Sequence, residues 1–169
     1  MLFISHFLLS AKLLVTTGRG TGGTKSEVID LLNPKSTCKN WADYPIDLYA
    51  AAGQIVDNYP IICGGRGGGR GGGNIFIDNC YKITPKSAVS LQSLASAKSH
   101  SSAGVFNNAL FVVGGYKFSG GPYYYSNTEY ISKTNHQNGP NAPVKAFSQC
   151  VIQINQNEIL LTGGGNFTV

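Results

Sequence analysis

The sequence lacks the features of a helical protein. Charged residues make up only 12% of its 169 residues, and glutamate occurs only at positions 27, 129 and 158. No Leu-rich stretch has the spacing of a helix face, whereas glycine contributes 22 residues. Many short apolar runs are separated by Gly, Asn, Ser and Pro, which is the pattern of short strands joined by turns. The composition therefore predicts an all-β protein.

Further absences exclude several functional classes. No apolar run reaches the roughly 18 residues of a transmembrane helix, so we expect no membrane span. The net charge of +5 is spread along the chain, unlike the concentrated basic patch of a nucleic-acid-binding protein. His6, His100 and His136 lie far apart, and the acidic residues do not cluster. Because metal and catalytic sites need such groupings, the sequence predicts no metal, no cofactor and no enzyme activity.

Residues 1–11 have two interpretations. The stretch MLFISHFLLS is apolar and is followed by Ala11, as in a short signal peptide that ends near residues 10–12. The positively charged start of a signal peptide is missing, however, and the run continues into the strand-like KLLVTTG. Residues 1–11 are therefore a signal peptide or a leading strand. Both an extracellular and a cytoplasmic location stay open.

A strand–glycine pattern repeats along the rest of the chain. Apolar runs end in glycine at positions 18, 64, 114 and 163, which are steps of 46, 50 and 49 residues. A further strand is expected after each of the first three glycine groups, at 26–31, 78–83 and 129–133. Another is expected before each later group, at 51–56, 102–106 and 149–154. Asn and Asp at 57–58, 107–108 and 155–157 suit the tight turns between these strands. A fainter fourth strand is expected at 40–43, around Trp41, and at 90–94.

The apolar strand before each glycine pair has a physical explanation. It shows no polar alternation, which indicates a sheet covered on both faces. The paired glycines end the strand where a side chain would obstruct a bend or a close backbone approach. One such sheet cannot bury its faces alone, so the units are expected to form an array.

This pattern resembles the kelch repeat, whose period is about 50 residues. The resemblance covers roughly residues 12–165. It rests on the paired glycines, on an aromatic strand that follows them, and on one Trp further on: Gly64, Gly65, Gly114, Gly115, Gly163, Gly164 and Trp41. Later repeats depart from the family pattern, with Leu91 or Leu94, and then residues 142–144, in the place of Trp. The first repeat has TTGRG without an immediate glycine pair.

The resemblance implies a kelch-type β-propeller of four-stranded antiparallel blades. The repeats would span residues 12–48, 49–98 and 99–145, with a partial repeat at 146–169. These make three to four blades, whereas propeller rings have about four to eight. We therefore interpret the chain as a fragment of a longer ring. Association with a second copy that closes the ring is the alternative.

Two loops are candidate binding segments. The segment GGRGGGRGGG at 64–73 is interpreted as a long hairpin loop, and its alternative is an RNA contact through Arg66 and Arg70. The loop at 116–127 carries Tyr123, Tyr124 and Tyr125, which either form a binding hot spot or begin the next strand. In kelch propellers such loops share a face with the segments that link the blades, here 97–100 and 139–145. The predicted site therefore comprises Arg66, Arg70, His100, Tyr123, Tyr124 and Tyr125.

The four cysteines leave their redox state open. Cys38, Cys63, Cys80 and Cys150 show no CxxC spacing, which argues against a zinc site. Their even number fits a secreted protein with disulfides, in one of three connectivities. Cys63 and Cys80 flank one hairpin loop, but we do not expect them to lie directly opposite each other. Buried thiols are the equal alternative.

The function implied by the resemblance is a non-catalytic scaffold that binds another protein through its loop face. A secreted carbohydrate-binding propeller, or a galactose-oxidase-like one with copper bound by Tyr and His, is the alternative. RNA contact through the Arg–Gly loop is the least favoured interpretation.

Overall fold

The computed structural model describes residues 12–17, 24–33, 39–67, 75–155 and 157–165. These residues form strands, turns and bends and contain no helix. The prediction of an all-β chain is confirmed. The strands are β1 (Lys12–Thr16), β2 (Ser26–Asp30), β3 (Lys39–Asn40), β4 (Leu48–Tyr49), β5 (Ala52–Val56), β6 (Tyr59–Cys63), β7 (Arg66–Gly67), β8 (Ile75–Phe76), β9 (Cys80–Ile83), β10 (Ala88–Ser90), β11 (Ser102–Phe106), β12 (Ala109–Val113), β13 (Tyr116–Phe118), β14 (Pro122–Tyr124), β15 (Thr128–Ile131), β16 (His136–Asn138), β17 (Cys150–Asn155) and β18 (Glu158–Thr162). Residues 1–11, with their two interpretations, lie outside the described residues.

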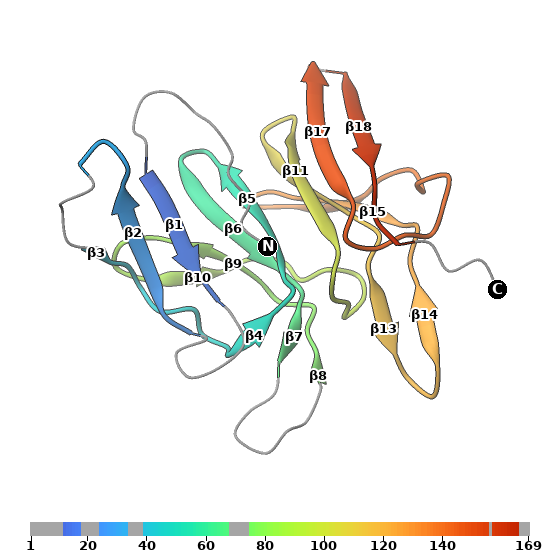
Figure 1. Ribbon diagram of the computed structural model, residues 1–169, viewed down its shortest axis with the longest axis horizontal. Coiled ribbons are helices and arrows are strands. Elements are labelled where there is room, and N and C mark those ends of the chain that lie inside the picture. Colours follow the sequence, from blue (N-terminus) through green and yellow to red (C-terminus); the bar gives the residue numbers. More distant parts are fainter. Residues whose placement is uncertain (1–11, 18–23, 34–38, 68–74, 156, 166–169) are drawn as a thin grey trace.

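The main sheets repeat one antiparallel plan. The second unit has the strand order β10-β9-β6-β5, and the third unit has the order β11-β12-β15-β16. The first unit consists of β1-β2-β3 and the fourth of β17-β18. Strands β5, β11 and β17, the first strands of three successive units, lie next to one another. The units therefore follow each other across the molecule from β1–β2 to β17–β18 (Figure 1).

The second sheet is covered on both of its faces. Ile61 and Cys63 pack into the seam with the third unit, where they meet Leu110 and Val112. On the other face, Ile62 packs with a second cluster around Tyr44. Residues of one strand alternate between the two faces. This explains why the strands before the glycine pairs are apolar throughout.

The equivalent strand of the fourth unit is more exposed. Strand β18 has the same apolar character, but its residues alternate between exposed and half-buried. Ile152 and Leu160 are 47% and 45% exposed. Among the described residues, β17 and β18 form a sheet of only two strands. Because no third strand flanks β18 there, less of its surface is covered.

Two of the three predicted turns between first and second strands, at 57–58 and 107–108, are confirmed in detail. Residue 156 of the third turn lies outside the described residues. Asp57 and Asn58 have φ angles of 49° and 64°, and Asn107 and Asn108 have φ angles of 49° and 58°. Two consecutive residues in the left-handed region form the hairpin turn that matches the twist of the strands. Asn and Asp tolerate this conformation, and the sequence supplies them at both turns.

The glycine pairs also adopt left-handed conformations, with φ angles between 65° and 106° at all six positions. At Gly114 a Cβ atom would overlap the carbonyl oxygen of Ala146. In the first unit Thr16 pairs with Ser26, as Val113 pairs with Thr128 in the third unit. The residue after Thr16, Thr17, therefore occupies the position of Gly114, and its φ angle is 58°. Aligning the first repeat on Gly18 was therefore wrong by one residue.

The two predicted fourth strands lie earlier than expected, and a third, which was not predicted, is present. They are β3, β10 and β16, and each is followed by a residue whose amide donates to the third strand: Trp41 to Ser26, Leu91 to Cys80 and Gly139 to Thr128. Leu91 and Gly139, rather than Leu94 and residues 142–144, therefore occupy the place of Trp41. The fourth strand starts early because the Thr84 hydroxyl accepts from the Ser87 amide at 2.9 Å and closes a tight turn. Sequence periodicity does not reveal such a turn.

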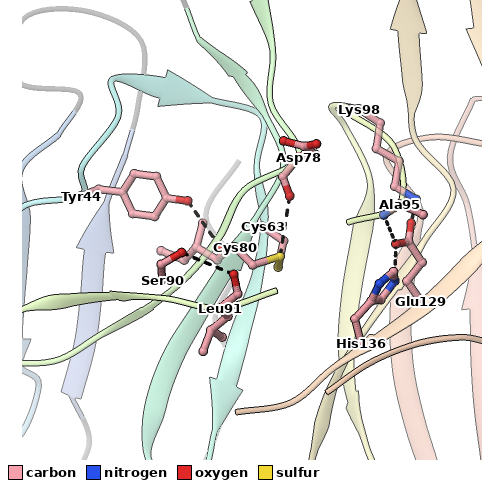
Figure 2. The surroundings of a disulfide bond; sticks show 11 residues. Tyr44, Cys63, Asp78, Cys80, Ser90, Leu91, Ala95, Lys98, Glu129 and His136 are labelled. Carbon is pink, nitrogen blue, oxygen red and sulfur yellow. Dashed lines mark hydrogen bonds and ion pairs between the residues drawn. A yellow bond between two sulfur atoms is a disulfide. The ribbon is translucent and has the colours of Figure 1, made fainter. Parts of the chain in front are cut away.

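The prediction that Cys63 and Cys80 are not directly opposite is wrong. They pair in register between β6 and β9 and form a disulfide (Figure 2). The long insertion at 64–79 leaves this register intact because it folds separately as β7 and β8. The same cross-strand position holds a Thr16–Ser26 hydroxyl contact of 2.6 Å in the first unit and Val113 opposite Thr128 in the third. Cys150 is free and exposed, and Cys38 lies outside the described residues.

We expect Gly114→Ala to destabilise the chain more than Gly163→Ala. Both substitutions place a Cβ atom at a left-handed φ angle, 65° and 69°, at a cost of about 1–2 kcal/mol. Only Gly114 has a neighbour in the way, whereas no described atom lies within 4 Å at Gly163. Overlap adds about 1–3 kcal/mol. Urea denaturation measures both, and equal losses would show that the approach to Ala146 is not what requires glycine.

Replacing Cys63 by Val and Cys80 by Thr should cost about 3 kcal/mol of stability, because the bond closes a loop of 17 residues. These side chains reproduce the pair at the same position of the third unit, so packing is largely kept. Both proteins would carry Cys38→Ser and Cys150→Ser, which prevents disulfide exchange. Under reducing conditions the difference should vanish. A difference of the same size in reductant would mean that packing, not the covalent bond, is responsible.

Candidate functional site at the loop face

Two hairpins project from the same end of the second and third units (Figure 1). Strands β7 and β8 follow Gly65, and strands β13 and β14 follow Gly115. The segments that lead into the next unit run beside them. Tyr49 pairs with Arg66, Ser99 with Tyr116 and Phe147 with Gly165. We call these two hairpins and the linkers at 48–51, 97–100 and 145–148 the loop face.

The linkers are joined to each other through their backbones. The amide of His100 donates to the Ala50 carbonyl at 2.9 Å, and the amide of Ser148 donates to the His100 carbonyl at 2.8 Å. All three residues have a φ angle of 54°, which is uncommon for residues other than glycine. His100 thereby lies at the centre of a chain of contacts that crosses three units.

The three predicted tyrosines do not share one environment. Tyr124 lies opposite Tyr116 in the β13–β14 hairpin, whereas Tyr123 lies opposite Lys117. Neighbouring residues of a strand point to opposite faces, so Tyr124 and Tyr123 are separated. Tyr125 packs edge-on against Tyr123, with ring centroids 4.8 Å apart. The third strand of the sheet begins only at Thr128, after all three tyrosines.

An aromatic row crosses the loop face. Its members come from two hairpins and two linkers, and all are half-buried: Phe76, His100, Tyr116, Tyr124 and Phe147. The Tyr116 ring lies 5.9 Å from Phe76, 5.0 Å from His100 and 5.6 Å from Phe147, measured between centroids. Tyr124 stacks on Phe147 at 5.7 Å. These separations are typical of favourable ring pairs, so the row is a packed unit rather than a set of loose side chains.

Arg66 lies at one end of the aromatic row. Its guanidinium carbon is 5.2 Å from the centre of the Phe76 ring. Its Nε atom is buried and has no hydrogen-bond partner among the described residues. Burial, and then the charge of Arg66, lower the pKa of His100 below its usual value. His100 is therefore a neutral ring at neutral pH, which suits its packing against Tyr116.

A buried carboxylate anchors the linker that carries His100. Glu129 and Lys98 are both fully buried, and their Oε1 and Nζ atoms are 2.7 Å apart. The other carboxylate oxygen accepts from the Ala95 amide at 2.7 Å and contacts His136 Nε2 at 2.8 Å (Figure 2). Asn127 donates to Oε1 at 2.8 Å. Segment 95–98 is thus held against the third unit immediately before the linker meets Tyr116.

The charge state of this pair follows from its surroundings. Burial alone would raise the pKa of Glu129, but the charge of Lys98 and its hydrogen bond outweigh that effect and lower it. Burial lowers the pKa of Lys98, and the carboxylate opposes this shift. A buried pair whose remaining donors and acceptors are occupied holds one geometry firmly.

The structure thus brings three of the predicted site residues, Arg66, His100 and Tyr124, into one row. Tyr123 and Tyr125 lie apart from it, with the ammonium groups of Lys145 and Lys98 each 5.4 Å from their ring centres. Arg70 falls outside the described residues.

Sequence reasoning missed Phe76, Tyr116, Phe147 and the Lys98–Glu129 pair. Tyr116 and Arg66 both directly follow a glycine pair. Comparing that single position between repeats would have singled out Tyr116.

One hollow of the described structure lies outside the aromatic row. It has a volume of about 500 Å³ and is bordered by Phe106, Tyr130 and Gly139 of the third unit. Gly104 of the same sheet meets Val151 of β17, so this face is turned toward the fourth unit. Two strands cover only its inner part. The hollow therefore lies beside a sheet with two described strands, and it shares no residue with the aromatic row.

Within the described ranges, no group of three His, Cys, Asp or Glu residues is placed to hold a metal ion. The same residues include no helix long and apolar enough to cross a membrane.

Comparison with known proteins gives a likeness of fold. No protein-family model and no curated protein matches the sequence. A solved structure described as "Structure of YjhT" is similar, with a TM-score of 0.70 and 13% sequence identity. The match covers 85% of this chain and 46% of that one. At this identity the likeness concerns the fold alone, and this chain spans about half the length of the matching structure.

Glu129→Gln should lower the free energy of unfolding by about 3–5 kcal/mol, because it leaves the buried ammonium group of Lys98 without a counter-charge. The matched control is Asp43→Asn, which removes the exposed Lys25–Asp43 pair and should cost less than about 1 kcal/mol. Urea denaturation at pH 7 measures both.

The pH dependence gives a second readout of the same variant. Because folding lowers the pKa of Glu129, its carboxylate stabilises the fold above the usual value of about 4.3, and this contribution is lost as the pH falls through the lowered pKa. The Gln variant should therefore lose less stability than the parent protein between pH 5 and pH 3. A parallel loss in both proteins would contradict this role of Glu129.

Proposed function

We propose that the chain is part of a kelch-type β-propeller that acts without catalysis and binds another protein through its loop face. Several observations support the propeller. The glycine pairs recur at steps of 50 and 49 residues between Gly64, Gly114 and Gly163, and the first two of them belong to four-stranded antiparallel sheets. Their first strands lie side by side, and left-handed glycine pairs end the second strands. The likeness to a structure about twice as long is in keeping with an incomplete ring.

The aromatic row is the observation that carries the binding function. Its rings are half-exposed, and their packing fixes them, so these rings would lose little conformational freedom when a partner docks. Tyr and Arg are the residue types that contribute most to the energy of protein interfaces. Arg66 adds a positive charge beside Phe76 at the end of the row.

The disulfide is relevant to whether the protein is extracellular or cytoplasmic. Disulfides persist in oxidising environments and are rare in the cytosol. The buried Cys63–Cys80 bond therefore supports a secreted or cell-surface protein over a cytoplasmic one.

A photo-crosslinking experiment tests the binding function. Benzoylphenylalanine replaces Phe118, which is 57% exposed at the tip of β13 on the side of Tyr116 and Tyr124. The protein is then irradiated in an extract and in a secreted fraction of its source cells. We expect a discrete protein adduct, reduced at least tenfold when Arg66→Ala and Tyr124→Ala are combined, because each hot-spot residue contributes about 2 kcal/mol or more.

The control places the same cross-linker at Val89, an exposed residue of the outer strand β10. Identical adducts from both positions, or none from position 118, would contradict binding through the loop face. Adducts with RNA that disappear in an Arg66→Ala, Arg70→Ala double variant would favour the RNA interpretation instead.

A further inference from the structure

The chemistry of the loop face indicates what kind of partner it takes. Arg66 forms no ion pair with any carboxylate in the described part of the chain. Its guanidinium lies over the Phe76 ring and its Nε atom is buried, so the two parallel hydrogen bonds that a guanidinium can form would come from its two terminal Nη groups. A carboxylate is the group that matches this edge in shape and charge.

The rings beside Arg66 select for side chains rather than for nucleic-acid bases. Phe76 and Tyr116 meet at an interplanar angle of 73°, and Tyr116 and Phe147 meet at 67°. Rings packed edge to face do not offer the series of parallel faces on which successive bases stack. They leave half-exposed surfaces against which one aromatic or aliphatic side chain can pack.

The distance between Arg66 and the Tyr116 ring limits how far apart the two matching groups of a peptide ligand can lie. Arg66 is 5.2 Å from the Phe76 centroid, and that centroid is 5.9 Å from Tyr116, so Arg66 lies within about 11 Å of the Tyr116 ring. An extended peptide advances about 3.3 Å per residue. A carboxylate on Arg66 and a ring on Tyr116 are therefore at most about three residues apart in one peptide.

We propose that the loop face binds an extended acidic peptide, with an Asp or Glu on Arg66 and an aromatic residue against Tyr116, no more than three positions further along. This inference rests on the proposed protein-binding function and specifies its partner. Lys117 and Lys145 add positive charge around the same end of the molecule, which favours acidic segments further.

A spacing series of synthetic peptides tests the inference. The probes are fluorescein-labelled Gly/Ser peptides that carry one Asp and one Phe, separated by zero, one, two, four or six residues. Fluorescence polarisation with the whole chain should give the tightest binding with zero to two intervening residues. At six residues we expect a dissociation constant at least fivefold weaker, because the two groups no longer reach both contacts in an extended peptide.

Two variants separate charge from packing. Arg66→Gln should weaken the best peptide at least tenfold and abolish its preference over the same peptide with Asn in place of Asp. Arg66→Lys should not restore binding, since an ammonium group cannot form the bidentate contact. Lys86→Gln, at an exposed position of the Thr84–Ser87 turn, is the matched control for loss of one positive charge and should leave binding unchanged.

The outcomes are distinct from those of the cross-linking experiment. No binding by any peptide of the series, no dependence on spacing, or equal binding by Arg66→Gln would overturn the inference. If a protein adduct at position 118 persists in those cases, the loop face still binds a protein, but one of different chemistry. Tighter binding of a uridine octamer than of every peptide would overturn both.

Discussion

The hydrogen bond from the second glycine of the first two pairs to the linker of the next unit organises the molecule. Gly65 donates to the Lys98 carbonyl at 2.8 Å, and Gly115 donates to the Ala146 carbonyl at 2.9 Å. Each bond needs a backbone that turns left-handed where the strand ends and that carries no Cβ atom. It joins the end of one strand to a residue more than thirty positions further along. The hairpins of the loop face leave from this point, so the bond also positions Arg66 and Tyr116.

The Lys98–Glu129 pair reinforces the same seam from inside. Burying two charges is costly, and this pair is stable because backbone, amide and imidazole groups complete the carboxylate's contacts. Hydrophobic packing in the seam could be satisfied by many small shifts of the linker. The Glu129 carboxylate accepts from four donors and would lose hydrogen bonds if the linker shifted. It therefore fixes the position from which His100 packs against the aromatic row.

Most of the repeat plan could be predicted from sequence because it depends on local rules. Apolar runs, Asn-containing turns and glycine pairs depend on neighbouring residues of the chain. The structure confirms β5 and β11 within a residue of their predicted bounds, and β6 and β12 end directly before the predicted glycine pairs. The start of β10 was misplaced because the turn before it is closed by the Thr84 hydroxyl and contains Pro85, whereas the prediction followed the apolar runs alone. Phe147 and Glu129 were missed because their importance comes from residues of other units. Long-range proximity of this kind leaves no periodic trace in one sequence.

The cross-strand position occupied by Cys63 and Cys80 has a consequence for how the array opens. At this position the first unit has a hydroxyl contact, the second has a covalent bond, and the third has Val113 opposite Thr128. In a repeat array each unit has its own stability, which is coupled only to that of its neighbours. We expect backbone amides to exchange with solvent fastest in the two-stranded fourth sheet and in the first, and slowest in β6 and β9. The disulfide-bonded second unit would then stay folded while the first and fourth units open and refold.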